Sequence, residues 1–134
     1  MKKVSLLLAF AVLASSAYAA AGDTETLPSG VIVTQIKEGT GAQPTAADTV
    51  SVNYRGTLAN GDEFDSSYKR GQPAMFPLGR VIPCWTQGLQ KMKVGGKAKL
   101  VCPAATAYGS RGVGSIPPNS DLTFEVELLK IVGN

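Results

Sequence analysis

Apolar and polar residues alternate along several stretches of the chain, as expected for strands with one buried face. The clearest run is Leu-Thr-Phe-Glu-Val-Glu-Leu at 122–128, whose phase slips at Leu128-Leu129 and so predicts a β-bulge. Residues 31–37, 50–55 and 97–102 show similar patterns, and 74–78 has the length of a short strand. Asn60-Gly61 is the residue pair of a type I′ hairpin and predicts a return strand carrying Phe64.

One segment has helical periodicity instead. Trp85, Leu89 and Met92 are spaced i, i+4 and i+7, which places them on one helix face. Pro83 suits the first turn, where its missing N–H needs no partner, and Gly95-Gly96 is expected to end the helix. The predicted fold class is therefore α+β, an antiparallel sheet of about five strands with one short helix on one face.

The first residues have the composition of an export signal. Lys2 and Lys3 precede an apolar run at 4–13, and Ala17-Tyr18-Ala19 fits a signal-peptidase site, with a second candidate site after Ala21. A retained membrane anchor is the alternative, but the apolar run is shorter than the ~20 residues of a spanning helix. We therefore expect a signal peptide at 1–21, a flexible lead at 22–27, one domain at 28–134, and a periplasmic or secreted protein.

Composition removes several functional classes. The chain has 13 basic and 10 acidic residues, and loss of Lys2 and Lys3 with the leader brings it close to neutrality, so nucleic-acid binding is not expected. Stable insertion into a membrane is not expected either. The absence of histidine argues against Ser-His catalysis and against most transition-metal sites, and we expect neither a metal nor a cofactor.

Five short motifs occur in a specific order, and together they carry a resemblance that none carries alone. They are Val52-Asn53-Tyr54-Arg55-Gly56, Phe64-Asp65-Ser66-Ser67, Val81-Ile82-Pro83-Cys84-Trp85, Ala107-Tyr108-Gly109 and Ile116-Pro117-Pro118, followed by the strand at 122–128. Over about residues 27–132 the chain resembles the FKBP-type peptidyl-prolyl isomerases. This resemblance implies a curved sheet half-wrapped around the short helix.

The resemblance also implies a site for proline. Asp65 and Tyr108 are expected to be the catalytic polar groups, with Asp65 near the rotating amide and the Tyr108 hydroxyl bonding a substrate carbonyl. Trp85 is expected to form the pocket floor, and the backbone N–H of Ile82 to bind the substrate on its other side. The expected walls are Tyr54, Phe64, Phe76, Val81, Ile82, Ile116 and Phe124. Taken singly, each of these residues would be interpreted as core or turn.

The chain departs from the family pattern at a few positions. Ala74 replaces a frequent aromatic residue, and the loop 110–115 has no large side chain, so the pocket rim should be more open. Cys84 and Cys102 stand where glycine and an apolar residue are usual. Both are expected to face the seam between helix and sheet, which favours a disulfide in an oxidising compartment over two free thiols.

The leading hypothesis is a prolyl isomerase that acts on proline-containing, unfolded or exported polypeptides. Rotation about an X–Pro bond breaks no covalent bond, so it needs no nucleophile, base or metal. The alternatives are a peptide-binding chaperone module with little turnover and a β-rich adhesion module without a concave pocket. We expect inhibition by macrolides of the tacrolimus and rapamycin type, and a monomer, because no helical dimerisation segment precedes Leu27.

Overall fold

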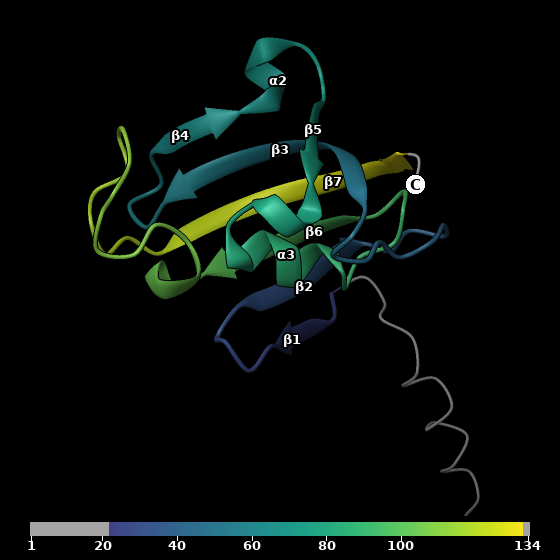
Figure 1. The fold of residues 1–134 in the computed structure, drawn as a ribbon, viewed down its shortest axis with the longest axis horizontal. Helices are drawn as coiled ribbons and strands as arrows, with labels where there is room; N and C mark the ends of the chain where they lie inside the picture. The colour runs from purple at the N-terminus through teal and green to yellow at the C-terminus, as the bar shows by residue number, and fades with distance from the viewer. Residues whose placement is uncertain (1–21, 133–134) are drawn as a thin grey trace, which may run out of the picture.

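The computed structural model describes residues 22–132. Figure 1 shows its strands and helices in chain order. The strands are β1 (Thr24–Thr26), β2 (Ile32–Lys37), β3 (Thr49–Leu58), β4 (Glu63–Ser66), β5 (Ala74–Pro77), β6 (Lys97–Cys102) and β7 (Leu122–Val132). The helices are α2 (Ser67–Arg70) and α3 (Pro83–Leu89), with 3-10 turns η1 (Leu78–Arg80) and η2 (Ala104–Thr106).

The strands of the described residues form one antiparallel sheet in the order β1-β2-β6-β7-β3-β4. Strand β7 pairs with β6 on one side and with the whole of β3 on the other. The free edge of β3 is shared, because β5 pairs with 49–52 and β4 pairs with 55–57. Helix α2 lies between these two short strands in the sequence, so the chain leaves the edge of β3 and returns to it.

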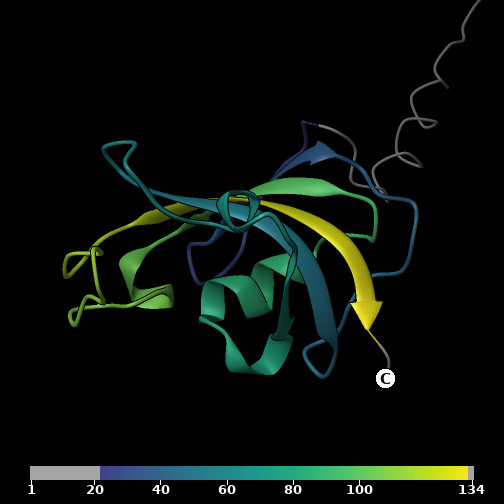
Figure 2. The same ribbon diagram turned by 90° about the horizontal axis from the view of Figure 1, so that it is seen from above.

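The core lies between the sheet and α3, and Figure 2 shows the sheet curving over this helix. Leu89 and Met92 on the helix side and Leu100 on β6 have no exposed surface. A Cβ at Gly88 would lie 2.9 Å from both methyl carbons of Leu100, so the glycine permits the close approach of helix and sheet. The predicted α+β fold, with its sheet wrapped around one short helix, is confirmed.

Two local features refine the predicted helix and strand. Helix α3 ends at Leu89 rather than at Gly95-Gly96, because the N–H groups of Lys91 and Met92 bond three residues back, to Gly88 and Leu89. The bulge at the end of β7 is confirmed, since Val52 pairs with Leu128 while Ser51 pairs with Lys130.

The hairpin between β3 and β4 differs from the predicted type I′ turn. Gly61 has a φ of 94°, while Asn119 is the sole non-glycine residue of 22–132 with a positive φ, so Asn60 is not left-handed. The N–H of Gly61 bonds the carbonyl of Leu58, and the N–H of Leu58 bonds that of Asp62. The loop is therefore the longer kind that closes with a single left-handed glycine.

The segment expected to be a flexible lead is part of the sheet. Thr24 pairs with Thr34 in β2, and the Gln35 N–H donates to the carbonyl of Asp23 at 2.8 Å. Leu27, which follows β1, is only 7 % exposed and belongs to the core. The predicted signal peptide at 1–21 lies outside the described residues.

Candidate functional site

A cavity of about 470 Å³ opens beside α3, and most of its lining is aromatic. Strands β3, β4, β5 and β7 supply its walls, α3 supplies Trp85, and the loop after β6 supplies Tyr108. The lining residues are Tyr54, Phe64, Asp65, Phe76, Arg80, Val81, Ile82, Trp85, Tyr108 and Phe124. Nine of the ten predicted site residues are thus brought together.

Trp85 is the centre of this aromatic group. Its ring makes edge-to-face contacts with Tyr54 at 5.2 Å, Phe76 at 5.2 Å and Phe124 at 5.3 Å between centroids, at interplanar angles of 83–86°. Three rings therefore stand perpendicular to the indole plane, which is the arrangement of a floor with walls. Edge-to-face pairs of this kind contribute about 0.5–1.5 kcal/mol each beyond the area they bury.

One glycine makes the far wall possible. Gly56 on β3 pairs with both Asp65 and Phe124. A Cβ at this position would lie 2.6 Å from Cζ of Phe64 and 2.8 Å from Cε1 of Phe124. Because glycine leaves that space empty, Phe64 and Phe124 meet above the strand with centroids 5.6 Å apart.

The polar edge of the cavity is a triangle of hydrogen bonds. The hydroxyl of Tyr54 donates to Asp65 Oδ2 at 2.5 Å, and Arg70 donates to Asp65 Oδ1 at 2.7 Å and to the Tyr54 hydroxyl at 2.8 Å. Helix α2 carries Arg70, and its N-cap Ser66 accepts from the Lys69 N–H. This short helix therefore positions the guanidinium that holds Asp65 in place.

The triangle shifts the ionisation of its members. Burial alone would raise the pKa of Asp65, but the hydrogen bonds from Tyr54 and Arg70 and the positive charge of Arg70 outweigh it, so that this pKa lies below its usual value. Burial, together with the bond to Asp65, raises the pKa of the Tyr54 hydroxyl. Asp65 is therefore a carboxylate and Tyr54 a neutral hydrogen-bond donor throughout the neutral range.

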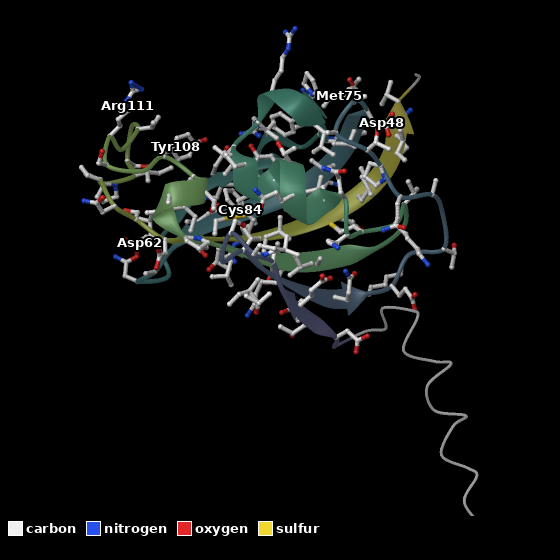
Figure 3. All side chains as sticks on the ribbon, turned by 60° about the horizontal axis from the view of Figure 1, so that its bottom comes forward. Asp48, Asp62, Met75, Cys84, Tyr108 and Arg111 are labelled. Carbon is white, nitrogen blue, oxygen red and sulfur yellow. A yellow bond between two sulfur atoms is a disulfide. The ribbon has the colours of Figure 1, made fainter. Side chains whose placement is uncertain are left out.

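Tyr108 and Ile116 come from the long loop between β6 and β7. Tyr108 is half-buried and lines the cavity, while Arg111 lies at the outer part of the same loop (Figure 3). Ile116 is 8 % exposed and packs in the core cluster, and it is not among the residues that line the cavity. The roles given to these residues and to Ile82 in substrate binding stay predictions.

Sequence reasoning missed three residues of the site: Gly56, Arg70 and Arg80. Arg70 follows Asp65 by five residues, but α2 has only four residues, too few to show a periodicity. Arg80 lies in the irregular stretch before α3, where nothing in the pattern indicated that it would reach the cavity. For Gly56 the signal was present, because a glycine inside a strand marks a close approach.

The two cysteines form a disulfide, with Cα atoms 5.6 Å apart. It joins the first turn of α3 to the end of β6, and neither residue has exposed surface. Figure 3 shows Cys84 on the helix that faces the sheet. Since Trp85 follows Cys84 directly, the cross-link also fixes the start of the cavity floor.

Residues 22–132 offer neither a metal-binding cluster nor a membrane-spanning helix. No group of three or more His, Cys, Asp or Glu side chains is placed to hold a metal ion. No helix in this part of the chain combines the length and apolar character needed to cross a membrane.

Comparisons with known proteins give a consistent result. Residues 40–129 match the family model of the FKBP-type peptidyl-prolyl cis-trans isomerase. An FKBP-type peptidyl-prolyl cis-trans isomerase FkpA of Escherichia coli is 52 % identical over 107 residues, which cover 80 % of this chain and 40 % of that protein. FK506-binding protein 1 of Dictyostelium discoideum is 52 % identical over 103 residues, 75 % of this chain and 96 % of that protein.

The solved structures agree with the sequences. A crystal structure of FkpA from Escherichia coli has a TM-score of 0.79 and 47 % identity, and the match covers 92 % of this chain and 58 % of that one. In the sequence comparison, the chain spans 40 % of the length of the Escherichia coli FkpA. By its family match, its identity to these relatives and its fold, the chain belongs to the FKBP-type peptidyl-prolyl cis-trans isomerases.

Proposed function

We propose that this protein catalyses cis–trans isomerisation of X–Pro bonds in exported polypeptides. The observation that carries the proposal is the aromatic cavity, in which three rings stand perpendicular to Trp85. A proline ring placed on the indole would be enclosed by apolar walls. This cavity also argues against the adhesion module, for which no concave pocket was expected.

The physical basis is the amide resonance that keeps a peptide bond planar. The barrier to rotation is about 20 kcal/mol, and unaided rotation takes ~10–100 s. The twisted transition state has less charge separation than the planar amide, so an apolar, water-poor site favours it relative to water. The Asp65 carboxylate and the Tyr54 hydroxyl would then form a fixed polar edge of the cavity, and Tyr108 would hold a flanking carbonyl.

The same site is the expected target of macrolides such as tacrolimus and rapamycin. Their pipecolyl ring resembles proline and would lie on Trp85, inside the same walls. Saturating rapamycin is expected to abolish catalysis on a short X-Pro peptide and to change the fluorescence of Trp85, the single tryptophan of the chain. Unchanged activity under saturation would contradict the placement of proline on the indole.

The direct test is catalysis of cis–trans exchange in a short X-Pro peptide. Neighbouring positions on β5 offer a matched pair: Phe76 lines the cavity, while Met75 is 57 % exposed and does not. Phe76→Leu should lower kcat/KM at least several-fold, and Met75→Leu should leave it unchanged. Equal effects would show that the cavity is not where catalysis occurs.

The same experiment separates the isomerase from a chaperone with little turnover. Suppression of aggregation of an unfolded protein, without acceleration of X–Pro exchange, would favour the chaperone module. We further propose that the protein is exported through its first 21 residues and works as a monomer. The mass of the mature protein from the exported fraction would show whether cleavage follows Ala19 or Ala21, and light scattering would test the monomer.

A further inference from the structure

Two charged side chains line the cavity, and only one of them is neutralised. Asp65 is bonded to Arg70 at 2.7 Å. Arg80 is exposed and makes neither an ion pair nor a side-chain hydrogen bond with any other residue of 22–132. The mouth of the cavity therefore carries a positive charge with no protein counter-charge.

The backbone that carries this charge is held firmly. Arg80 ends the η1 turn, and Leu78 at the start of the turn has no exposed surface. The Leu78 N–H donates to the carbonyl of Asp48 at 2.8 Å, and the Thr86 hydroxyl donates to the Leu78 carbonyl at 2.7 Å. The turn is thus tied to the segment before β3 and to α3, and it anchors the backbone of Arg80 at the rim of the cavity.

The position of Arg80 suits contact with a substrate residue that flanks the proline, rather than with the proline ring itself. Val81 and Ile82, the next two residues, also line the cavity, so the guanidinium stem starts at the edge of the proline site. A side chain flanking the proline would pass this edge. Guanidinium pairs best with carboxylate, which it can bind through two parallel hydrogen bonds.

We propose that Arg80 makes the enzyme selective for X–Pro bonds that have an acidic residue, Asp or Glu, directly beside the proline. This inference rests on the proposed isomerase function. An ion pair at an exposed rim is screened by water, so the selectivity is modest. The expected preference for Glu over Gln is about 1.5- to 5-fold in kcat/KM at low salt, and it weakens as ionic strength rises.

The experiment measures catalysed cis–trans exchange by NMR in short peptides. The peptides carry Glu, Gln or Lys immediately before the proline in one series and immediately after it in the other. The wild type is compared with Arg80→Gln and Arg80→Glu. Lys130→Glu is the control, because it makes the same charge change as Arg80→Glu on an exposed position of β7, roughly 20 Å along the strand from Phe124.

In the wild type, at least one series is expected to show the preference for Glu over Gln. Arg80→Gln should bring the ratio close to one, Arg80→Glu should favour Lys peptides, and Lys130→Glu should keep the wild-type ratio. A wild-type ratio near one in both series, a ratio retained in Arg80→Gln, or an equal loss in Lys130→Glu would overturn the inference. Failure to catalyse exchange in any peptide would instead refute the proposed function.

Discussion

Removal of the Cys84–Cys102 cross-link tests how much stability the disulfide adds to a sheet that already has a continuous core. The two residues are 18 positions apart, and a closed loop of that length lowers the entropy of the unfolded chain by the equivalent of about 3 kcal/mol. Truncating both side chains to alanine also leaves a small cavity, which costs about 1 kcal/mol more. The unfolding free energy should therefore fall by about 3–4 kcal/mol, and Tm by ~10–20 °C.

The assay is guanidinium unfolding of the wild type and of the double variant Cys84→Ala/Cys102→Ala. The double variant is preferred to reduction alone, because both sulfurs are fully buried and a reductant reaches them slowly. Reductant should not change the stability of the variant, which controls for effects unrelated to the bond. Thiol counting under denaturing, non-reducing conditions should find no free thiol in the wild type.

The reasoning separates stability from activity. Leu89, Leu100 and Leu128 are fully buried in the core between helix and sheet, so the variant should fold and keep its cavity. A loss of less than about 1 kcal/mol would refute the loop-closure argument. A variant that fails to fold would refute the view that the sheet core is sufficient, and two free thiols in the exported wild type would contradict the bond itself.

Three further outcomes are expected. Gly56→Ala should destabilise the fold by about 1–3 kcal/mol and lower kcat/KM, because the added Cβ displaces the rings of Phe64 and Phe124. An unchanged denaturant midpoint and unchanged activity would mean that the two rings move aside at no cost in stability or catalysis. Tyr108→Phe should lower kcat/KM about 2- to 10-fold, the value of one neutral hydrogen bond, at unchanged Tm, whereas a lower Tm would assign the hydroxyl to the fold. Activity and stability should be flat from about pH 5.5 to 8.5. The lowered pKa of Asp65 adds to the free energy of unfolding fully above pH ~4, and this stability is lost as pH falls through the lowered pKa; the raised pKa of Tyr54 adds stability that is lost only above pH ~10. A bell-shaped activity profile near neutrality would contradict this mechanism.

Periodicity predicted the long elements of the fold well. The alternation at 122–128 gave β7 with Phe124 and Val126 buried, and the i, i+4, i+7 spacing placed Trp85 and Leu89 on the inner face of α3. Strand β1 and helix α2 have three and four residues, fewer than a period needs in order to be recognised. Their formation depends on pairing and capping partners elsewhere in the chain.

Family motifs predicted the residue types of the candidate site, but they did not predict which side chains the folded backbone directs into the cavity. Ile116 has the expected identity, yet the turn between Val113 and Ile116 directs it into the core rather than to the cavity lining. Arg70 and Arg80 belong to the site because α2 and η1 bring them there, and no residue pattern near them indicates such a contact.

The placement of β7 at the centre of the sheet has a consequence for when this protein can begin to work. Strand β7, the last strand within residues 22–132, is inserted between β6 and β3, and it carries Phe124 opposite Gly56, some 70 positions earlier in the sequence. Such distant pairings form late, because a long loop must close first. A chain synthesised from its N-terminus contains Tyr54 and Trp85 long before it contains Phe124. A chain that stops before β7 therefore lacks the middle of the sheet and one aromatic wall of the cavity, so the cavity is complete only after the last of these strands has been made.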